Sequence, residues 1–157
     1  MSGIGTCLWF AGQAGEAAKF YVDVFPNSRI EGISRYPDTD GGAPGEVLSV
    51  SFVLDGREFR AMNGAERNAF TEAISFELGF ATQEDLDERW FALTADGGEE
   101  GRCGWLKDKF GVSWQLVPTM LPQVLGGSNA EGAQRAMQAM LGMHRLVISE
   151  LQAAYGG

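Results

Sequence analysis

The chain is poor in the residues that most often build metal sites and disulfides. Its 157 residues include one histidine, His144, and two cysteines, Cys7 and Cys103. Two cysteines this far apart have neither the number nor the spacing of a disulfide framework or a zinc knuckle, so we expect two buried thiols. A single histidine without a Gly-x-Ser-x-Gly motif also disfavours a Ser-His-Asp hydrolase.

Positive charge and long apolar runs are scarce as well. Lys and Arg number 12 against 21 Asp and Glu, which gives a formal net charge of -9. An acidic chain repels phosphate backbones and anionic membrane surfaces, so neither nucleic acid nor membrane is an expected partner. No stretch approaches the ~20 apolar residues of a membrane-spanning helix, and the first residues lack a basic region followed by an apolar run. These absences favour a cytoplasmic protein.

The first part of the chain combines strand patterns with one helical pattern. The helix follows Gly12 and Gln13, and Pro26 and Asn27 end it. Asp55-Gly56 predicts a hairpin turn, since both residues tolerate positive φ. The Pro- and Gly-rich residues 37–46 predict an exposed loop. Strands are expected at 6–11, 29–35, 47–54 and 58–63.

The same order of elements then returns. A strand is predicted at 73–78, followed by a helix with Thr82 as its N-cap and a buried stripe of Leu86, Trp90 and Leu93. A Gly-Gly-Glu-Glu turn, a strand at 102–106, a turn at 107–111 with solvated charges, and a strand at 112–117 complete the unit. Such a repeat predicts an α+β fold of two βαβββ modules that share one core, at about 3–66 and 70–119.

Residues 120–157 form a helical tail beyond the second module. Helices are predicted at 130–141 and 149–155. Met137 and Met140 fall at helical spacing with Ala133 and Leu141, which is typical of a surface that faces the core or a second copy of the chain. His144 lies in this tail, where we expect a surface or packing residue rather than a ligand.

Several segments carry a resemblance to a known family. They are LWFAGQAGEAAKFYVDVFPNSRI, LDGREFRAMNG, EEGRCGWLKDKFGVSWQLVPTMLPQVL and AQRAMQAML. Over nearly its whole length the chain resembles the PhnB-like branch of the vicinal oxygen chelate superfamily, the glyoxalase and bleomycin-resistance group. The resemblance implies paired βαβββ modules curled into a cup-shaped mixed sheet, often in homodimers, with a ligand or metal inside the cup. Many members carry the label 3-demethylubiquinone-9 3-methyltransferase.

The same resemblance bears on metal binding. Metal-dependent members of the superfamily present a glutamate on the last strand of each module and a histidine or similar ligand on the first, and Gln115 falls where a glutamate would be. An amide is a weaker donor than a carboxylate. The other matching positions offer no histidine or carboxylate either: Thr6 or Cys7, Met62 or Asn63, and Ala73 or Ser75. We therefore expect neither a metal nor a cofactor.

Two interpretations of Gln115 remain open. Either its amide hydrogen-bonds within the sheet, as most buried amides do, or it orients a polar group of a small ligand in an aromatic-lined cup. Strand alternation places Trp114 on the opposite face, where it should be a core residue. Asn63 has an alternative role as a strand-ending turn residue. The candidate ligand-binding residues are Trp9, Phe10, Asn63, Phe76, Trp105 and Gln115.

Three functions remain possible on these grounds. The favoured one is a metal-free protein that binds a small molecule, as a homodimer. The second is an enzyme, either a metal-dependent lyase, isomerase or dioxygenase, or the methyltransferase of the family label. A G-x-G-x-x-G motif for S-adenosylmethionine is missing, which disfavours the methyltransferase. In the third, the tail serves an interaction partner and the cup is vestigial.

Overall fold

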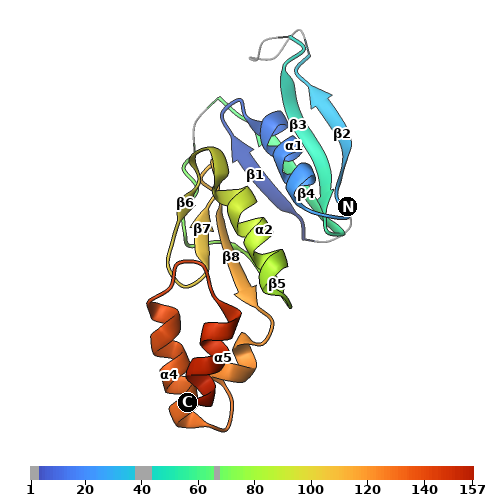
Figure 1. The fold of residues 1–157 in the computed structure, drawn as a ribbon. Helices are drawn as coiled ribbons and strands as arrows, with labels where there is room; N and C mark the ends of the chain where they lie inside the picture. The colour runs from blue at the N-terminus through green and yellow to red at the C-terminus, as the bar shows by residue number, and fades with distance from the viewer. Residues whose placement is uncertain (1–3, 38–43, 66–67) are drawn as a thin grey trace. The chain divides into compact units, whose positions relative to one another are not determined.

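The computed structural model describes residues 4–37, 44–65 and 68–157, which fold as two compact units (Figure 1). Residues 1–69 are called module one, and residues 70–157 are called module two together with the tail. Each unit contains a four-stranded mixed sheet, which confirms the predicted α+β fold of two βαβββ modules. None of the helices within the described ranges is long and apolar enough to cross a membrane.

Module one is a sheet in the order β1-β4-β3-β2 with α1 packed on one face. β1 pairs in parallel with β4, and the other neighbours are antiparallel. Asp55 and Gly56, with φ of 44° and 79°, form the predicted turn between β3 and β4. The elements are β1 (Thr6–Phe10), α1 (Ala14–Val24), β2 (Arg29–Arg35), β3 (Val47–Leu54) and β4 (Arg57–Asn63). Most of the predicted 37–46 loop lies outside the described residues.

Module two repeats this topology in the order β5-β8-β7-β6, with β5 parallel to β8. Thr82 caps α2 as predicted, because its hydroxyl accepts a hydrogen bond from Asp85 N at 3.2 Å. The elements are β5 (Phe76–Phe80), α2 (Gln83–Thr94), a short 3-10 turn η1 (Ala95–Gly97), β6 (Glu99–Glu100), β7 (Trp105–Lys107), β8 (Ser113–Pro118) and, in the tail, α3 (Leu121–Leu125), α4 (Ala130–Leu141) and α5 (Ile148–Gly156).

Three predicted boundaries in module two are wrong. β5 begins at Phe76 rather than residue 73, because the Thr71 hydroxyl accepts from Ala73 N and forms a local turn. Glu99–Glu100 is a strand and not a turn, since the reversal occurs at Asp96 and Gly97, both at positive φ. Cys103 and Gly104, with φ of 56° and 85°, form a turn where a strand was expected. The sequence patterns also do not reveal α3.

In each module the sheet has a helix face, which packs against α1 or α2, and an opposite face, called here the far face. The apolar core lies between helix and sheet, and the predicted stripe Leu86, Trp90 and Leu93 is fully buried there. Tyr21 of α1 stacks on Phe52 of β3 with ring centroids 6.3 Å apart. Side chains that are paired across neighbouring strands lie on the same face. The pairing register therefore assigns every strand residue to one of the two faces.

The tail has a small core of its own. Leu121, Leu146 and Leu151 are buried, and Met140 packs against them. Met137 and Leu141, which were predicted to share the surface of Met140, are 39% and 55% exposed. The two residues of α4 that are buried are small, Gly132 and Ala136. The tail thus buries only part of its predicted apolar stripe.

Candidate ligand-binding site

Gln115 lies in the middle of β8 on the far face of module two. Its partners in the pairing register are Glu77 on β5 and Trp105 on β7, so these three side chains share the far face. The Gln115 amide Nε2 donates to Ser75 Oγ at 2.7 Å. The amide is thus hydrogen-bonded locally, and the residue lies beside an aromatic ring as the ligand-binding interpretation requires.

Phe76 lies on the other side of the sheet from Gln115. Its ring packs on Trp114 with centroids 5.1 Å apart, on the helix face. Trp114 is 2% exposed and donates from Nε1 to Asp108 Oδ2 at 2.9 Å, which confirms its predicted place in the core. The structure therefore brings Trp105 and Gln115 together, but it places Phe76 with the core.

Trp9 and Phe10 point to opposite faces of β1. Phe10 is buried on the helix face of module one. Trp9 is on the far face and 39% exposed. Its ring lies against Gly64, where an added Cβ would be 2.1 Å from the indole. Of these two candidates, Trp9 is the one that a ligand on the far face could reach.

Asn63 links three elements of module one. Its Oδ1 accepts from Ala14 N at 2.9 Å, and its Nδ2 donates to Val47 O at 2.9 Å. Gln13, the residue at the N-cap position of α1, makes no side-chain cap hydrogen bond. Asn63 therefore satisfies one of the free N–H groups at the helix start. It is the last residue of β4, and its side chain acts as a cap rather than as a turn residue.

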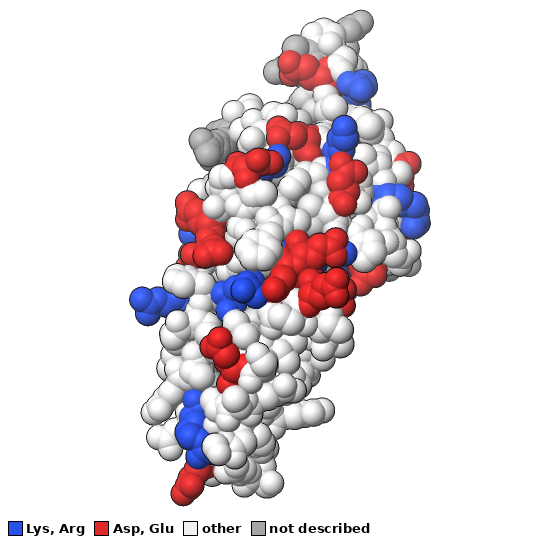
Figure 2. Space-filling model, viewed as in Figure 1, with Lys and Arg blue, Asp and Glu red and all other residues white. Residues whose placement is uncertain are grey.

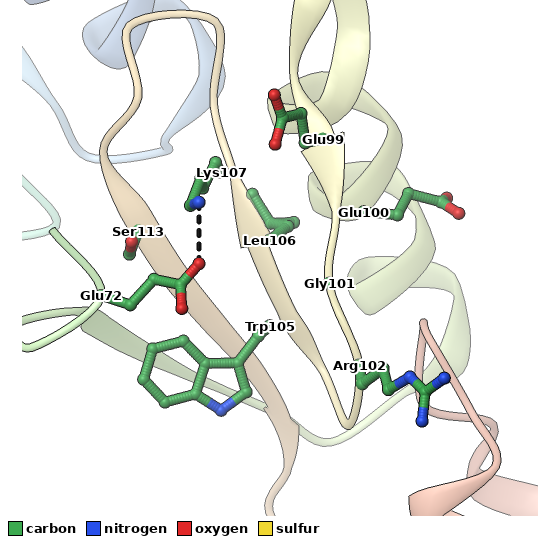
Figure 3. Close-up of a pocket in the computed structure, with 9 residues that line it drawn as sticks. All are labelled: Glu72, Glu99, Glu100, Gly101, Arg102, Trp105, Leu106, Lys107 and Ser113. Atoms are coloured by element: carbon green, nitrogen blue, oxygen red, sulfur yellow. Dashed lines mark ion pairs between the residues drawn. The ribbon is translucent and has the colours of Figure 1, made fainter. Parts of the chain in front are cut away.

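A pocket of about 250 Å³ lies in module two, over β6 and β7 (Figure 3). Trp105 is the one predicted site residue among its walls. The neighbouring strand positions Lys107 and Ser113, which are paired across β7 and β8, lie on the same far face as Trp105. The full lining is Glu72, Glu99, Glu100, Gly101, Arg102, Trp105, Leu106, Lys107 and Ser113.

Ser113 is the unusual member of this lining. It is 2% exposed, and within the described part of the chain its Oγ is buried without a hydrogen-bond partner. Buried hydroxyls are nearly always paired, because an unpaired one loses its water without compensation. A polar atom of this kind in a pocket wall is able to bind a polar group that enters the pocket.

Lys107 is held between acidic groups. Its Nζ forms a 2.7 Å ion pair with Glu72 (Figure 3), and its partner across β6 is Glu99. The hydrogen bond to Glu72 is the main reason that the pKa of Lys107 is raised above its ordinary value, and the charges of Glu72 and Glu99 add to this effect. Lys107 was expected to be a turn residue, but it is the last residue of β7.

Asp108, which follows Lys107, is not the solvated turn charge that we expected. It is 2% exposed, and its carboxylate accepts from Phe110 N, Val112 N and Trp114 Nε1. It therefore fixes the turn that joins β7 to β8, the two strands that carry Trp105 and Ser113.

The positions that would match superfamily metal ligands do not suit a metal ion. In module one Cys7 is paired with Arg60, whose positive charge opposes a cation. In module two Gln115 is paired with Glu77, a carboxylate that sequence reasoning missed because it placed the strand start too early. Throughout residues 4–37, 44–65 and 68–157, no three His, Cys, Asp or Glu side chains are grouped as a metal site.

Cys7 is exposed and Cys103 half-buried, so the prediction of two buried thiols is wrong.

Comparisons with known proteins agree with the fold. A family model described as 3-demethylubiquinone-9 3-methyltransferase matches residues 2–117. A PhnB protein from Bacillus cereus with the same description is 36% identical, with a TM-score of 0.68, over 74% of this chain and 98% of that chain. No curated protein matches the chain.

More distant structures share the fold alone. The protein PA1353 from Pseudomonas aeruginosa is 19% identical with a TM-score of 0.62, over 75% of this chain and 98% of that chain. The fosfomycin resistance protein FosX from Listeria monocytogenes, solved with Mn(II) and sulfate, is 17% identical with a TM-score of 0.53, over 74% and 91% of the two chains. The family model ends at residue 117, so the tail lies beyond the matched region although sequence reasoning included it in the resemblance.

Proposed function

The chain belongs to the PhnB-like 3-demethylubiquinone-9 3-methyltransferase family, structurally related to glyoxalase and fosfomycin resistance proteins, and on that premise we propose that it binds a small molecule without a resident metal. The binding site is the far-face pocket of module two. The observation that carries the proposal is Ser113 Oγ, a buried hydroxyl in the pocket wall without a partner among the described residues. Ligand sites typically combine apolar surface with a few polar groups of this kind.

Gln115 lies next to the pocket residue Trp105 and extends the site along the sheet. They are partners in the register of β7 and β8 and therefore lie beside each other. Trp105 supplies an aromatic surface. The side-chain oxygen of Gln115, Oε1, can accept a hydrogen bond from a ligand, because the hydrogen bond to Ser75 uses Nε2 instead. This arrangement supports the ligand-orienting role of Gln115.

The chemistry of the donor groups supports the absence of a metal. Glu77 has only the neutral amide of Gln115 beside it in the register, and the thiol of Cys7 faces a guanidinium. Divalent ions are normally held by several carboxylate, imidazole or thiolate groups. The Mn(II) of FosX belongs to a protein with which this chain shares 17% identity.

The methyltransferase reaction has less support. S-adenosylmethionine enzymes of the Rossmann type bind their cofactor at the carboxyl ends of parallel strands. The sheets of module one and module two each have one parallel pair and otherwise antiparallel strands. The family description is therefore not extended to an activity of this chain.

Tryptophan fluorescence gives a direct test. Trp90 and Trp114 are buried, so a ligand at either far face should change the emission of Trp9 or Trp105. A metabolite library is screened for fluorescence change, and each hit is repeated on Trp105→Phe and Trp9→Phe. We expect the response to be lost in the first variant and kept in the second. A response lost only in Trp9→Phe, or no response to any compound, would contradict the proposed site.

Metal content is measured separately. Untagged protein is incubated with Zn, Ni, Fe, Mn or Mg, dialysed, and measured by elemental mass spectrometry. We expect no ion to remain in stoichiometric amount. About one retained ion per chain would contradict the metal-free proposal and favour the enzyme alternative.

The homodimer stays a prediction. Most of the surface of α4 and α5 in Figure 2 is neither acidic nor basic, and Met137 and Leu141 on α4 are exposed. Light scattering coupled to gel filtration measures the mass in solution against the 16.9 kDa of one chain.

A further inference from the structure

We propose that the pocket accepts a small organic cation, an amine attached to a single flat apolar ring. The inference rests on the proposed function, since it names the ligand class of the same pocket. Three features of the walls carry it: the excess of carboxylates, the buried acceptor oxygen of Ser113, and the indole ring of Trp105.

On the far face, the carboxylates that line the pocket outnumber the ammonium groups. One ammonium, Lys107, is ion-paired with Glu72 and lies opposite Glu99, so two carboxylates surround one positive group. The other charged residues of the lining do not change this balance. Glu100 accepts a hydrogen bond from Trp90 Nε1 on the helix side, and Arg102 extends away from the Lys107–Glu72 pair (Figure 3).

This balance discriminates between ligands by charge. An ammonium group that enters beside Lys107 gains the attraction of the second carboxylate. A ligand carboxylate would have to displace Glu72 from Lys107 and would still face Glu99. Attraction between partly exposed charges is modest, but it acts in the same direction as the acidic surface of the whole chain.

Ser113 and Trp105 supply the remaining contacts. A serine oxygen has lone pairs that accept an N–H, and Ser113 Oγ has no such donor within the described part of the chain. Trp105, half-buried on the same far face, presents an indole, the aromatic ring that cations prefer. The pocket volume of about 250 Å³ is smaller than the range of drug-sized ligand pockets, so it suits a ligand with one ring.

The test uses three probes that share a ring and differ in charge: benzylamine, benzyl alcohol and benzoate. Each is titrated at neutral pH into ¹⁵N-labelled protein, and the shifts of the Trp105 indole N–H and the Ser113 amide are followed. We expect benzylamine to bind roughly fivefold more tightly than benzyl alcohol, and benzoate more weakly than both. High salt should reduce the benzylamine advantage, because it screens the carboxylates.

Single substitutions at Glu99 and Ser113 test whether these residues cause the preference for benzylamine. Glu99→Gln should weaken benzylamine roughly two- to fivefold and leave benzyl alcohol unchanged, while the control Glu131→Gln on α4 should change neither. Ser113→Ala removes a hydroxyl that has no partner among residues 4–37, 44–65 and 68–157, so the thermal midpoint should stay the same or rise while benzylamine affinity falls roughly tenfold. That combination is not expected of a residue with a purely structural role.

The outcomes separate the two proposals. If benzoate binds at Trp105 and Ser113 as tightly as benzylamine, or Glu99→Gln has no effect, the ligand class is wrong and the pocket remains a binding site. If no probe shifts these signals, the ligand class is wrong; the pocket itself is contradicted only if the metabolite library also gives no response that depends on Trp105.

Discussion

Replacing Asp108 should be among the most damaging single changes in module two. Its buried carboxylate accepts from Val112 N at 3.1 Å and from Trp114 Nε1 at 2.9 Å, and a third bond reaches Phe110 N at 2.9 Å. Asp108→Ala leaves at least two buried donors unpaired, at about 1 to 3 kcal/mol each. Allowing for partial relaxation, we expect a loss of about 2 to 5 kcal/mol in the free energy of unfolding.

Asp108→Asn is the sharper variant, because it keeps the shape of the side chain. An amide has one acceptor oxygen, whereas the two carboxylate oxygens here serve donors on both sides. If the amide oxygen faces the backbone N–H groups of Phe110 and Val112, the NH₂ group is placed against Trp114 Nε1, and two donors face each other. If the amide is flipped, its oxygen accepts from Trp114 Nε1, but the NH₂ group then faces the two backbone N–H groups. Neither orientation satisfies all three donors, so we expect a loss of about 1 to 3 kcal/mol.

Urea unfolding followed by fluorescence and circular dichroism measures both variants. Asp96→Asn is the matched control, because it makes the same charge change at an exposed turn residue whose positive φ asparagine tolerates. The control should stay within about 0.5 kcal/mol of the parent protein. If Asp108→Asn were no more destabilised than Asp96→Asn, the buried hydrogen-bonded carboxylate would not exist as described.

Three further outcomes follow from other contacts. Arg145 of the tail pairs with Asp87 of α2, so Arg145→Met should cost about 1 kcal/mol and speed proteolysis of the tail, while equal cleavage rates would argue against this attachment. Thr82→Ala should lower the free energy of unfolding by about 1 kcal/mol and Thr82→Ser should restore most of it, since the cap is a hydroxyl oxygen. The raised pKa of Lys107 means that its pair with Glu72 stabilises the fold below the ordinary pKa of 10.5 and loses this contribution as the pH rises through the folded value. The difference in melting temperature between the parent and Lys107→Gln should therefore be present at neutral pH and vanish in strong alkali.

Local chemistry made much of the fold predictable. The cap at Thr82 and the turn at Asp55-Gly56 depend on a few neighbouring residues, and both are confirmed. The βαβββ repeat follows from periodicity that extends over whole elements, so boundary errors of a few residues did not change the fold. The start of β5 was predicted wrongly because a single side-chain hydrogen bond, from Ala73 N to the Thr71 hydroxyl, forms a local turn where the strand was expected to begin.

The site was less predictable, because it depends on strand register. Alternation correctly separated Gln115 from Trp114, but it could not show that Phe76 shares the face of Trp114. Likewise the pocket requires residues from three separate segments, Glu72, Lys107 and Ser113, whose proximity no local pattern encodes. Asp108 was misjudged for the same reason, since its burial depends on the position of Trp114 on the next strand.

The tail lies beyond the family match, yet it supports the rim of the pocket. Cys103 N donates to Met143 O and Gly104 N donates to His144 O, each at 2.8 Å, while His144 Nδ1 lies 2.6 Å from Gly101 O. Because a carbonyl oxygen only accepts, Nδ1 is the donor in that contact. These bonds hold a turn in which Cys103 adopts the left-handed conformation, at a cost of about 1 to 2 kcal/mol for a residue with a side chain. Gly101 and Arg102, in the same turn, line the pocket, so its shape in this chain depends on tail residues that lie beyond the stretch matched by the family model.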